Sequence, residues 1–241
     1  MRVAVEVCVT TPQEATAATQ AGADAVEVCT WLGAGGITPS NGMVARIAAE
    51  TGLTVRALVR PATGSFHYDE STLIVLLTEI MAFHMVPRLG GIVTGVLSDE
   101  NGLPLRLRVI GEACAKIPWT FHRAIDHAPD RPTILEQALA AGATRILTSG
   151  GEATALAGAR GIAALVEQAN GRCVIAAAAG IGPHNVVEVV ERTGVPEVHF
   201  SAQRIVPAEG MPLGAEGNRT VLPDVAKIEG VMNALVKAGL R

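Results

Sequence analysis

Short apolar segments alternate with longer amphipathic segments from one end of this chain to the other. Eight of the apolar segments have the length and β-branched content of strands, at residues 3–9, 25–29, 55–60, 91–97, 119–123, 145–149, 173–177 and 198–201. The amphipathic segments have the apolar period of helices, at residues 12–21, 43–51, 70–83, 105–115, 133–141, 154–169, 185–192 and 225–238. Eight strand–helix units in 241 residues predict an α/β protein, a (β/α)8 barrel of the TIM type that forms a single domain over residues 1–241.

Glycine residues support the same topology. Gly22, Gly52, Gly142 and Gly194 each follow a predicted helix, where glycine supplies the left-handed residue that turns the chain back into a strand. An open, doubly wound sheet is the alternative, but no G-x-G-x-x-G motif follows the first strand. The closed barrel is therefore expected, with its active face at the C-terminal ends of the strands.

The tetrapeptide Val-Glu-Val-Cys occurs twice, at residues 5–8 and 26–29, each time within a predicted strand. Because side chains alternate along a strand, Glu6 and Cys8 share one face of the first strand, and Glu27 and Cys29 share one face of the second. A buried carboxylate needs a partner, and a thiol is a soft metal ligand. The repeat therefore predicts a polar barrel interior suited to metal binding.

The same alternation extends the inward-facing set to the other strands. Besides Cys8 and Cys29, the polar residues predicted to face inward are Glu6, Glu27, Arg56, Arg60, Thr94, Thr120, His122, Thr148, His199 and Ser201. An ordinary barrel interior is branched and apolar. The two interpretations are a structural lattice of paired charges and a ligand site, and the position of the charges toward the strand C-termini favours the ligand site.

Several residues near the strand C-termini are candidates for chemistry. The candidate catalytic residues are Glu27, His122 and Asp126, because carboxylates and histidine serve as general acids and bases. The residues predicted to bind a ligand are Glu6, Arg60, Thr94, Arg123, Gly180, His199 and Ser201. Arg60 precedes a proline and could clamp an anion, and the glycine-rich loop at residues 180–185 leads into a helix whose free N–H groups could hold a phosphate.

Four cysteines are spread along the chain without a close pair. Cys8 and Cys29 are the candidate metal ligands, whereas Cys114 and Cys173 are expected to be structural. Neither Cys8 nor Cys29 has a histidine nearby in the sequence, which disfavours a closed four-ligand zinc site. Soft thiolates select Cu(I) or zinc, and low-coordinate Cu(I) is less demanding than a closed zinc site.

Composition excludes some classes of function. A net charge of -4 leaves no basic surface for nucleic acid. No long uncharged apolar segment predicts a membrane span, and no signal peptide is evident, so a cytoplasmic location is expected. The lysines are Lys116, Lys227 and Lys237. None is expected at the C-terminal end of a strand, which argues against a Schiff-base aldolase.

Motifs throughout the chain resemble the CutC copper homeostasis family. The matching segments are residues 6–9, 26–29, 35–40, 59–61, 93–97, 120–126, 146–150 and 198–202. The resemblance implies a TIM-type barrel, a cytoplasmic location, self-association as a dimer or larger homo-oligomer, and a role in copper trafficking or tolerance. It also places Cys8 and Cys29 in the motifs to which the family's copper binding is attributed. Ala62-Thr63-Gly64 departs from the family, which tends to have Arg-Gly-Gly there.

Two functions follow as hypotheses. The first is copper homeostasis, with Cu(I) bound by the thiols at the barrel mouth. The alternative is an enzyme of the isomerase or lyase type that acts on a small anionic or phosphorylated metabolite. The expected partner is accordingly a copper ion or a small anion, without nucleic acid or membrane. A scaffold for other proteins would not explain charged groups inside a barrel.

Overall fold

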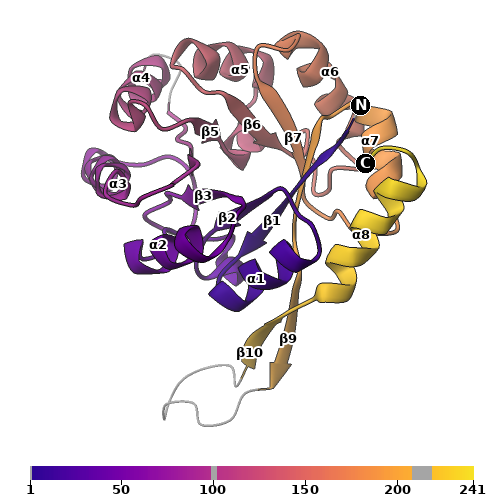
Figure 1. Ribbon diagram of the computed structural model, residues 1–241. Helices are drawn as coiled ribbons and strands as arrows, with labels where there is room; N and C mark the ends of the chain where they lie inside the picture. Colours follow the sequence, from indigo (N-terminus) through magenta and orange to yellow (C-terminus); the bar gives the residue numbers. More distant parts are fainter. Residues whose placement is uncertain (1, 99–101, 208–218) are drawn as a thin grey trace.

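The computed structural model describes residues 2–98, 102–207 and 219–241. Within these residues, parallel strands close into a barrel in the order β1 to β8, with helices around the outside (Figure 1). The barrel strands are β1 (Ala4–Val9), β2 (Ala25–Val28), β3 (Thr54–Leu58), β4 (Gly91–Thr94), β5 (Trp119–Phe121), β6 (Arg145–Thr148), β7 (Val174–Ala178) and β8 (Glu197–Ser201). The predicted TIM-type barrel is confirmed.

The helices follow the strands in the predicted order. They are α1 (Pro12–Gln20), α2 (Asn41–Glu50), α3 (Glu70–Phe83), α4 (Leu103–Cys114), α5 (Arg131–Ala140), α6 (Ala159–Ala169), α7 (Val186–Thr193) and α8 (Val225–Lys237). Short 3-10 helices, η1 (Leu32–Ala34) and η2 (Arg123–His127), follow β2 and β5. Side-chain caps define several helix starts: in α1, Thr11 accepts from the Glu14 N–H and Glu14 reaches back in a capping box. None of the helices in the described ranges has both the length and the apolarity to cross a bilayer.

Two features differ from the prediction. An antiparallel ribbon of β9 (Gln203–Pro207) and β10 (Arg219–Pro223) lies between β8 and α8 and extends away from the barrel (Figure 1). The alternation of strands and helices predicts only the strands of the barrel. Among the described strands, β9 and β10 pair with each other and not with the barrel, so that alternation does not predict them. Helix α6 begins at Ala159 rather than at residue 154, because residues 150–158 form turns that lie against the end of β6.

The barrel strands separate two layers of side chains. Between the strands and the helices lies a continuous apolar core that includes Val5, Val7 and Val26. Inside the barrel, a small apolar cluster joins Cys8, Cys29, Leu58 and Val93, and another joins Leu147, Ala176 and Ala178. The repeated motif therefore directs its valines toward the helices and its thiols toward the barrel axis.

Gly158 packs directly against the chain that leaves β6. A Cβ atom at this position would lie 1.8 Å from the carbonyl oxygen of Ser149, which is backbone and cannot swing aside. We expect Gly158→Ala to lower the free energy of unfolding by about 1–3 kcal/mol, as overpacking does elsewhere. Urea denaturation checks this against Gly42→Ala, since a Cβ at Gly42 meets nothing within 4 Å. Equal stability of the two variants would show that this contact is not tight.

Candidate functional site

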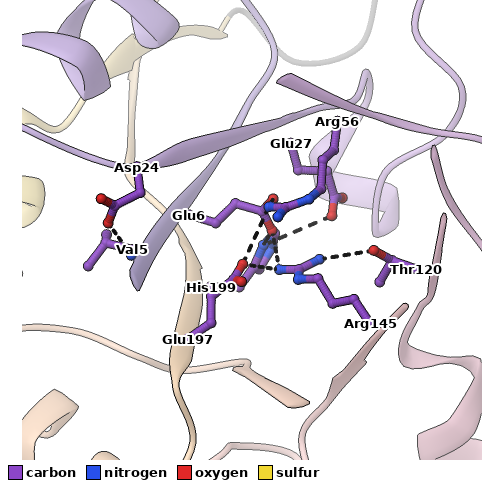
Figure 2. Close-up of polar contacts among 9 residues, drawn as sticks. All are labelled: Val5, Glu6, Asp24, Glu27, Arg56, Thr120, Arg145, Glu197 and His199. Atoms are coloured by element: carbon purple, nitrogen blue, oxygen red, sulfur yellow. Dashed lines mark hydrogen bonds and ion pairs between the residues drawn. The ribbon is translucent and has the colours of Figure 1, made fainter. Parts of the chain in front are cut away.

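A layer of paired charges crosses the barrel interior around Glu6 (Figure 2). The Glu6 carboxylate is fully buried and accepts from Arg56 Nη1 at 2.5 Å and from Arg145 Nη2 at 2.5 Å. Glu197 accepts from Arg145 Nη2 at 2.6 Å. Burial alone would raise the pKa of Glu6, but Arg145, His199 and Arg56 together hold it well below its usual range. Glu6 is therefore ionised and closely paired.

Sequence reasoning missed Arg145 and Glu197 and misplaced two threonines. Because Arg145 faces inward, Thr148 on the same strand faces outward, and its hydroxyl donates to Asp126 at 2.5 Å. Val93 is part of the interior cluster, so its neighbour Thr94 also faces outward and donates to the carbonyl of Val59 at 2.9 Å. The predictions that Thr94 and Thr148 face inward are therefore wrong, and Thr94, a predicted ligand-binding residue, does not line the cavity described below. On β4 and β6 the polar residue was predicted to face inward, but its hydroxyl group donates a hydrogen bond to the neighbouring strand or loop.

His199 connects the charged layer to Glu27. Its Nδ1 lies 2.7 Å from Glu6 Oε2 and 3.9 Å from Glu27 Oε2 (Figure 2). Burial lowers the pKa of His199, but Glu27 and Glu6 outweigh it and raise that pKa overall. Burial also raises the pKa of Glu27. Glu27 Oε2 has no hydrogen-bond partner among the residues that the structure describes, an arrangement that costs about 1–3 kcal/mol unless a ligand or ion pairs with it.

The two thiols of the repeated motif meet inside the barrel. Cys8 Sγ lies 3.3 Å from Cys29 Sγ, and both side chains are buried. The hydrogen bond to Cys29, burial and the nearby charges raise the pKa of Cys8 well above its usual value. Single donor atoms of Cys8, Glu27 and His199 lie within 4.8 Å of one another. We call Cys8, Glu27, Cys29 and His199 the floor cluster.

The other two thiols lie outside the floor cluster. Cys114 is in α4 and is buried in the apolar core between strands and helices, and Cys173 precedes β7 at the edge of that core. Burial raises the pKa of Cys114 to about 12 and that of Cys173 to about 11. These placements agree with the structural roles expected for them.

A cavity of about 870 Å³ opens above the floor cluster at the C-terminal ends of the strands. The floor cluster lines its inner end, and the other polar lining residues include Arg60, His122, Arg123, Ser201 and Lys227. Gly180 also lines the cavity, whereas Glu6 lies beneath it in the charged layer. The volume is within the range of small-molecule sites.

His122 is held as a neutral ring, whose buried Nε2 has no hydrogen-bond partner among the described residues. Its Nδ1 accepts from the Ala124 N–H at 3.2 Å, so the proton of the neutral ring is on Nε2. Burial, assisted by Arg60, lowers the pKa of His122 to about 3. Gly95 makes room for the ring, because a Cβ there would lie 2.4 Å from Nδ1. The expectation of an acid–base group that titrates near neutrality is therefore wrong for His122.

The depressed pKa of His122 makes stability fall as pH falls. The unfolded chain binds a proton near pH 6.5, whereas the folded chain does so only near pH 3, so acid favours unfolding between these values. We expect His122 to contribute about 2 kcal/mol to the loss of stability between pH 7 and pH 5. Urea denaturation at both pH values should show a flatter dependence in His122→Asn and an unchanged one in the exposed control His184→Asn. An unchanged dependence in His122→Asn would contradict the assignment.

Arg60 and Asp126 organise loops around the cavity. Arg60 donates to the carbonyls of Ala34, Gly36 and Gly64 at 3.2, 2.9 and 2.9 Å, so most of its guanidinium is engaged with the backbone. Asp126 does not line the cavity; its carboxylate accepts from Arg123, Thr148, Ser149 and Gly151. The structure therefore corrects the prediction of a catalytic Asp126: it positions Arg123 and the β6 loop.

The glycine-rich loop before α7 is closed on itself. Asn185 Oδ1 accepts from the Gly182 N–H at 2.9 Å, and Asn185 Nδ2 donates to the Gly180 carbonyl at 2.9 Å. The Gly182 N–H is therefore already paired, which weakens the case for a phosphate cradle. Gly180 nevertheless contributes to the cavity wall.

Lys227 reaches the cavity from α8. Its Nζ donates to the Ser201 carbonyl at 2.6 Å, and burial lowers its pKa. The expectation that no lysine lies at the strand C-termini is therefore wrong, because the first turn of α8 folds back over the end of β8. Together with Arg60 and Arg123, Lys227 gives the cavity a cationic upper wall.

The fold and the site define a TIM-type barrel protein with a thiol, carboxylate and imidazole cluster beneath an open cavity. The family model of the CutC family matches residues 3–204, and the chain belongs to that family. Family protein CutC of Caulobacter vibrioides is 41% identical over 219 residues, which cover 90% of this chain and 89% of that protein. Family protein CutC of Xanthomonas axonopodis pv. citri is 36% identical over 245 residues, which cover 97% of this chain and 99% of that protein.

Solved structures agree with this assignment. One is the structure of CutC of Streptococcus agalactiae, a candidate copper homeostasis protein. It has a TM-score of 0.76 and 29% identity, and the match covers 82% of this chain and 98% of that chain. Phosphoribosylanthranilate isomerase of Thermotoga maritima has a TM-score of 0.61 at 14% identity, and the match covers 98% of this chain and 99% of that chain. The second likeness shows the barrel fold alone.

Proposed function

We propose that this CutC-family protein acts in copper homeostasis by binding Cu(I) through Cys8 and Cys29. The observation that carries the proposal is the 3.3 Å separation of the two Sγ atoms at the inner end of an open cavity. Thiolates are soft ligands that select Cu(I). The copper role given to the Streptococcus agalactiae relative supports the same conclusion.

The geometry of the thiols fits a metal ion after a small adjustment. For metal–sulfur bonds of about 2.3 Å, the sulfur atoms lie about 3.8 Å apart at a tetrahedral angle and about 4.6 Å apart in a linear two-ligand arrangement. The thiols would therefore separate by about 0.5–1.3 Å from the observed 3.3 Å, which side-chain rotations can provide. Since burial and the hydrogen bond favour protonated Cys8, Cu(I) binding would release a proton.

A reducing compartment fits this chemistry. Two thiols in contact remain available as ligands only where oxidation does not join them, so we place the protein in the cytoplasm.

Competition with a chromophoric Cu(I) chelator such as bicinchoninate, under anaerobic conditions, tests the proposal. We expect one Cu(I) per chain. Cys8→Ser and Cys29→Ser should each weaken binding by more than about 100-fold, since even residues that only support metal ligands contribute about 10–100-fold. Cys173→Ser is the matched control, because Cys173 lies outside the floor cluster. Wild-type affinity in the Cys8→Ser, Cys29→Ser double variant would refute thiol ligation.

The cavity favours a second candidate function. A volume of about 870 Å³ far exceeds what one ion needs, and Arg60, Arg123 and Lys227 line it. This suits an isomerase or lyase that acts on a small anionic metabolite, with Glu27 as the proton-transfer group. Thermal shift measurements with sugar phosphates and carboxylates test it, because a ligand that binds only the folded state must stabilise it. No shift across that panel would count against it.

A further inference from the structure

We infer that Cys8, Glu27 and His199 form a second, overlapping metal site, which binds a divalent cation of the Zn²⁺ class. The inference rests on the proposed function only in that both sites use Cys8. Their other ligands differ: Cys29 completes the Cu(I) site, whereas Glu27 and His199 complete the divalent site. The two metals would therefore compete for one thiol.

The positions of the donor atoms support three-ligand coordination. One donor atom from each of Cys8, Glu27 and His199 lies within 4.8 Å of the others. Around a tetrahedral zinc ion, ligand atoms of these types lie about 3.3–3.8 Å apart. The three side chains would close in by about 1.5 Å or less. No histidine lies near Cys8 or Cys29 in the sequence, which disfavoured a closed four-ligand zinc site, but pairing of β1 with β8 places His199 beside Glu6 on the neighbouring strand.

Glu6 prepares His199 as a ligand. Glu6 also pairs with the guanidinium groups of Arg56 and Arg145, so its Oε2 accepts from the ring, whose Nδ1 lies 2.7 Å away and carries the proton. In the neutral ring the lone pair is then on Nε2, the atom that would bind the metal. Histidine ligands in metalloproteins commonly donate their other N–H to a carboxylate in this way.

Glu27 supplies the independent evidence for a bound cation. Its side chain is 6% exposed, and Oε2 is a buried acceptor that lacks a partner within the described residues. A cation beside Cys8 and His199 would pair with this oxygen. The charges also balance: one Cys8 thiolate and one Glu27 carboxylate neutralise a divalent ion when His199 is neutral. A neutral site suits a buried position better than a charged one does.

The fourth coordination position would face the cavity. All three ligands line the cavity of about 870 Å³, so water or a ligand oxygen can reach the ion from that side. Three protein ligands and one open position are the arrangement of catalytic zinc sites, whereas structural zinc sites are closed. The class of ligand that fits is a small molecule with a carbonyl or hydroxyl oxygen.

Titration of the metal-free full-length protein with Co²⁺, a spectroscopic substitute for Zn²⁺, tests the inference. We expect one Co²⁺ per chain, with the intense visible bands of tetrahedral cobalt and a near-ultraviolet thiolate charge-transfer band. Zn²⁺ should displace it. Glu27→Gln and His199→Gln should each weaken Co²⁺ binding by about 100-fold or more, and Cys8→Ser should abolish the charge-transfer band. Glu136→Gln, on the exposed surface, is the matched control.

Cu(I) titration of the same variants separates this inference from the proposed function. Glu27→Gln and His199→Gln should retain Cu(I) binding, whereas Cys29→Ser should lose Cu(I) and keep the cobalt bands. Retained Cu(I) binding also shows that a variant has folded, and circular dichroism checks this independently. Weak octahedral cobalt bands in the wild type, or unchanged Co²⁺ affinity in both folded variants, would overturn the divalent site without touching the copper proposal.

Discussion

Replacing Glu6 by glutamine should destabilise the protein by about 3–5 kcal/mol, because it removes the carboxylate at the centre of the charged layer. Glu6 is fully buried and binds both Arg56 and Arg145. Glutamine has nearly the same shape but no charge, so it leaves the buried guanidinium of Arg145 and the partly buried one of Arg56 with less compensation. The free energy of unfolding, from urea denaturation at pH 7, measures the loss.

An exposed ion pair provides the control for Glu6→Gln. Glu136 pairs with Arg172 at 2.7 Å, but both side chains are close to half exposed. Surface pairs of this kind contribute little, so Glu136→Gln should change stability only slightly. If Glu6→Gln were as stable as Glu136→Gln, the charged layer would not hold the barrel together.

Arg145→Met should produce a loss of comparable size, with an additional dependence on pH. Arg145 pairs with Glu6 and Glu197. In the wild type the pKa of Glu6 is held well below its usual value, so the stabilisation is present above about pH 4.5 and is lost as pH falls through the folded-state value. Without Arg145, burial is opposed only by His199 and Arg56, so we expect the pKa of Glu6 to be higher than in the wild type. The folded variant then binds a proton readily, and its deficit relative to the wild type should shrink as pH falls.

Urea denaturation of wild type and Arg145→Met between pH 8 and pH 5 measures this difference. We expect a deficit of about 3–5 kcal/mol at the upper end of the range and a smaller one at the lower end. A deficit that stays constant with pH would show that lost packing, and not an uncompensated Glu6 carboxylate, causes the destabilisation.

Local patterns in the sequence were sufficient to predict the barrel. The alternation of segments identified its strands, and the parity of Glu6, Cys8, Glu27 and Cys29 correctly oriented β1 and β2. The same rule failed on β4 and β6. There Thr94 and Thr148 are polar but face outward, and the inward Arg145 stands at the start of its strand.

The rest of the site depends on contacts that no local pattern reveals. His199 meets Glu6 because the barrel closes β8 onto β1, which brings together residues 193 positions apart. Lys227 enters the cavity because α8 begins beside the end of β8. Glu197 was missed because β8 begins one residue earlier than its apolar segment indicated. These features follow from register and closure, which are properties of the whole barrel.

X-ray absorption at the copper edge, on anaerobic protein loaded with one Cu(I) per chain, tests most directly whether Cys8 and Cys29 bind copper together. The expected spectrum is that of Cu(I) with two sulfur neighbours, and it should be lost in the Cys8→Ser, Cys29→Ser double variant. Copper surrounded only by nitrogen and oxygen, or an unchanged spectrum in that variant, would contradict thiol ligation.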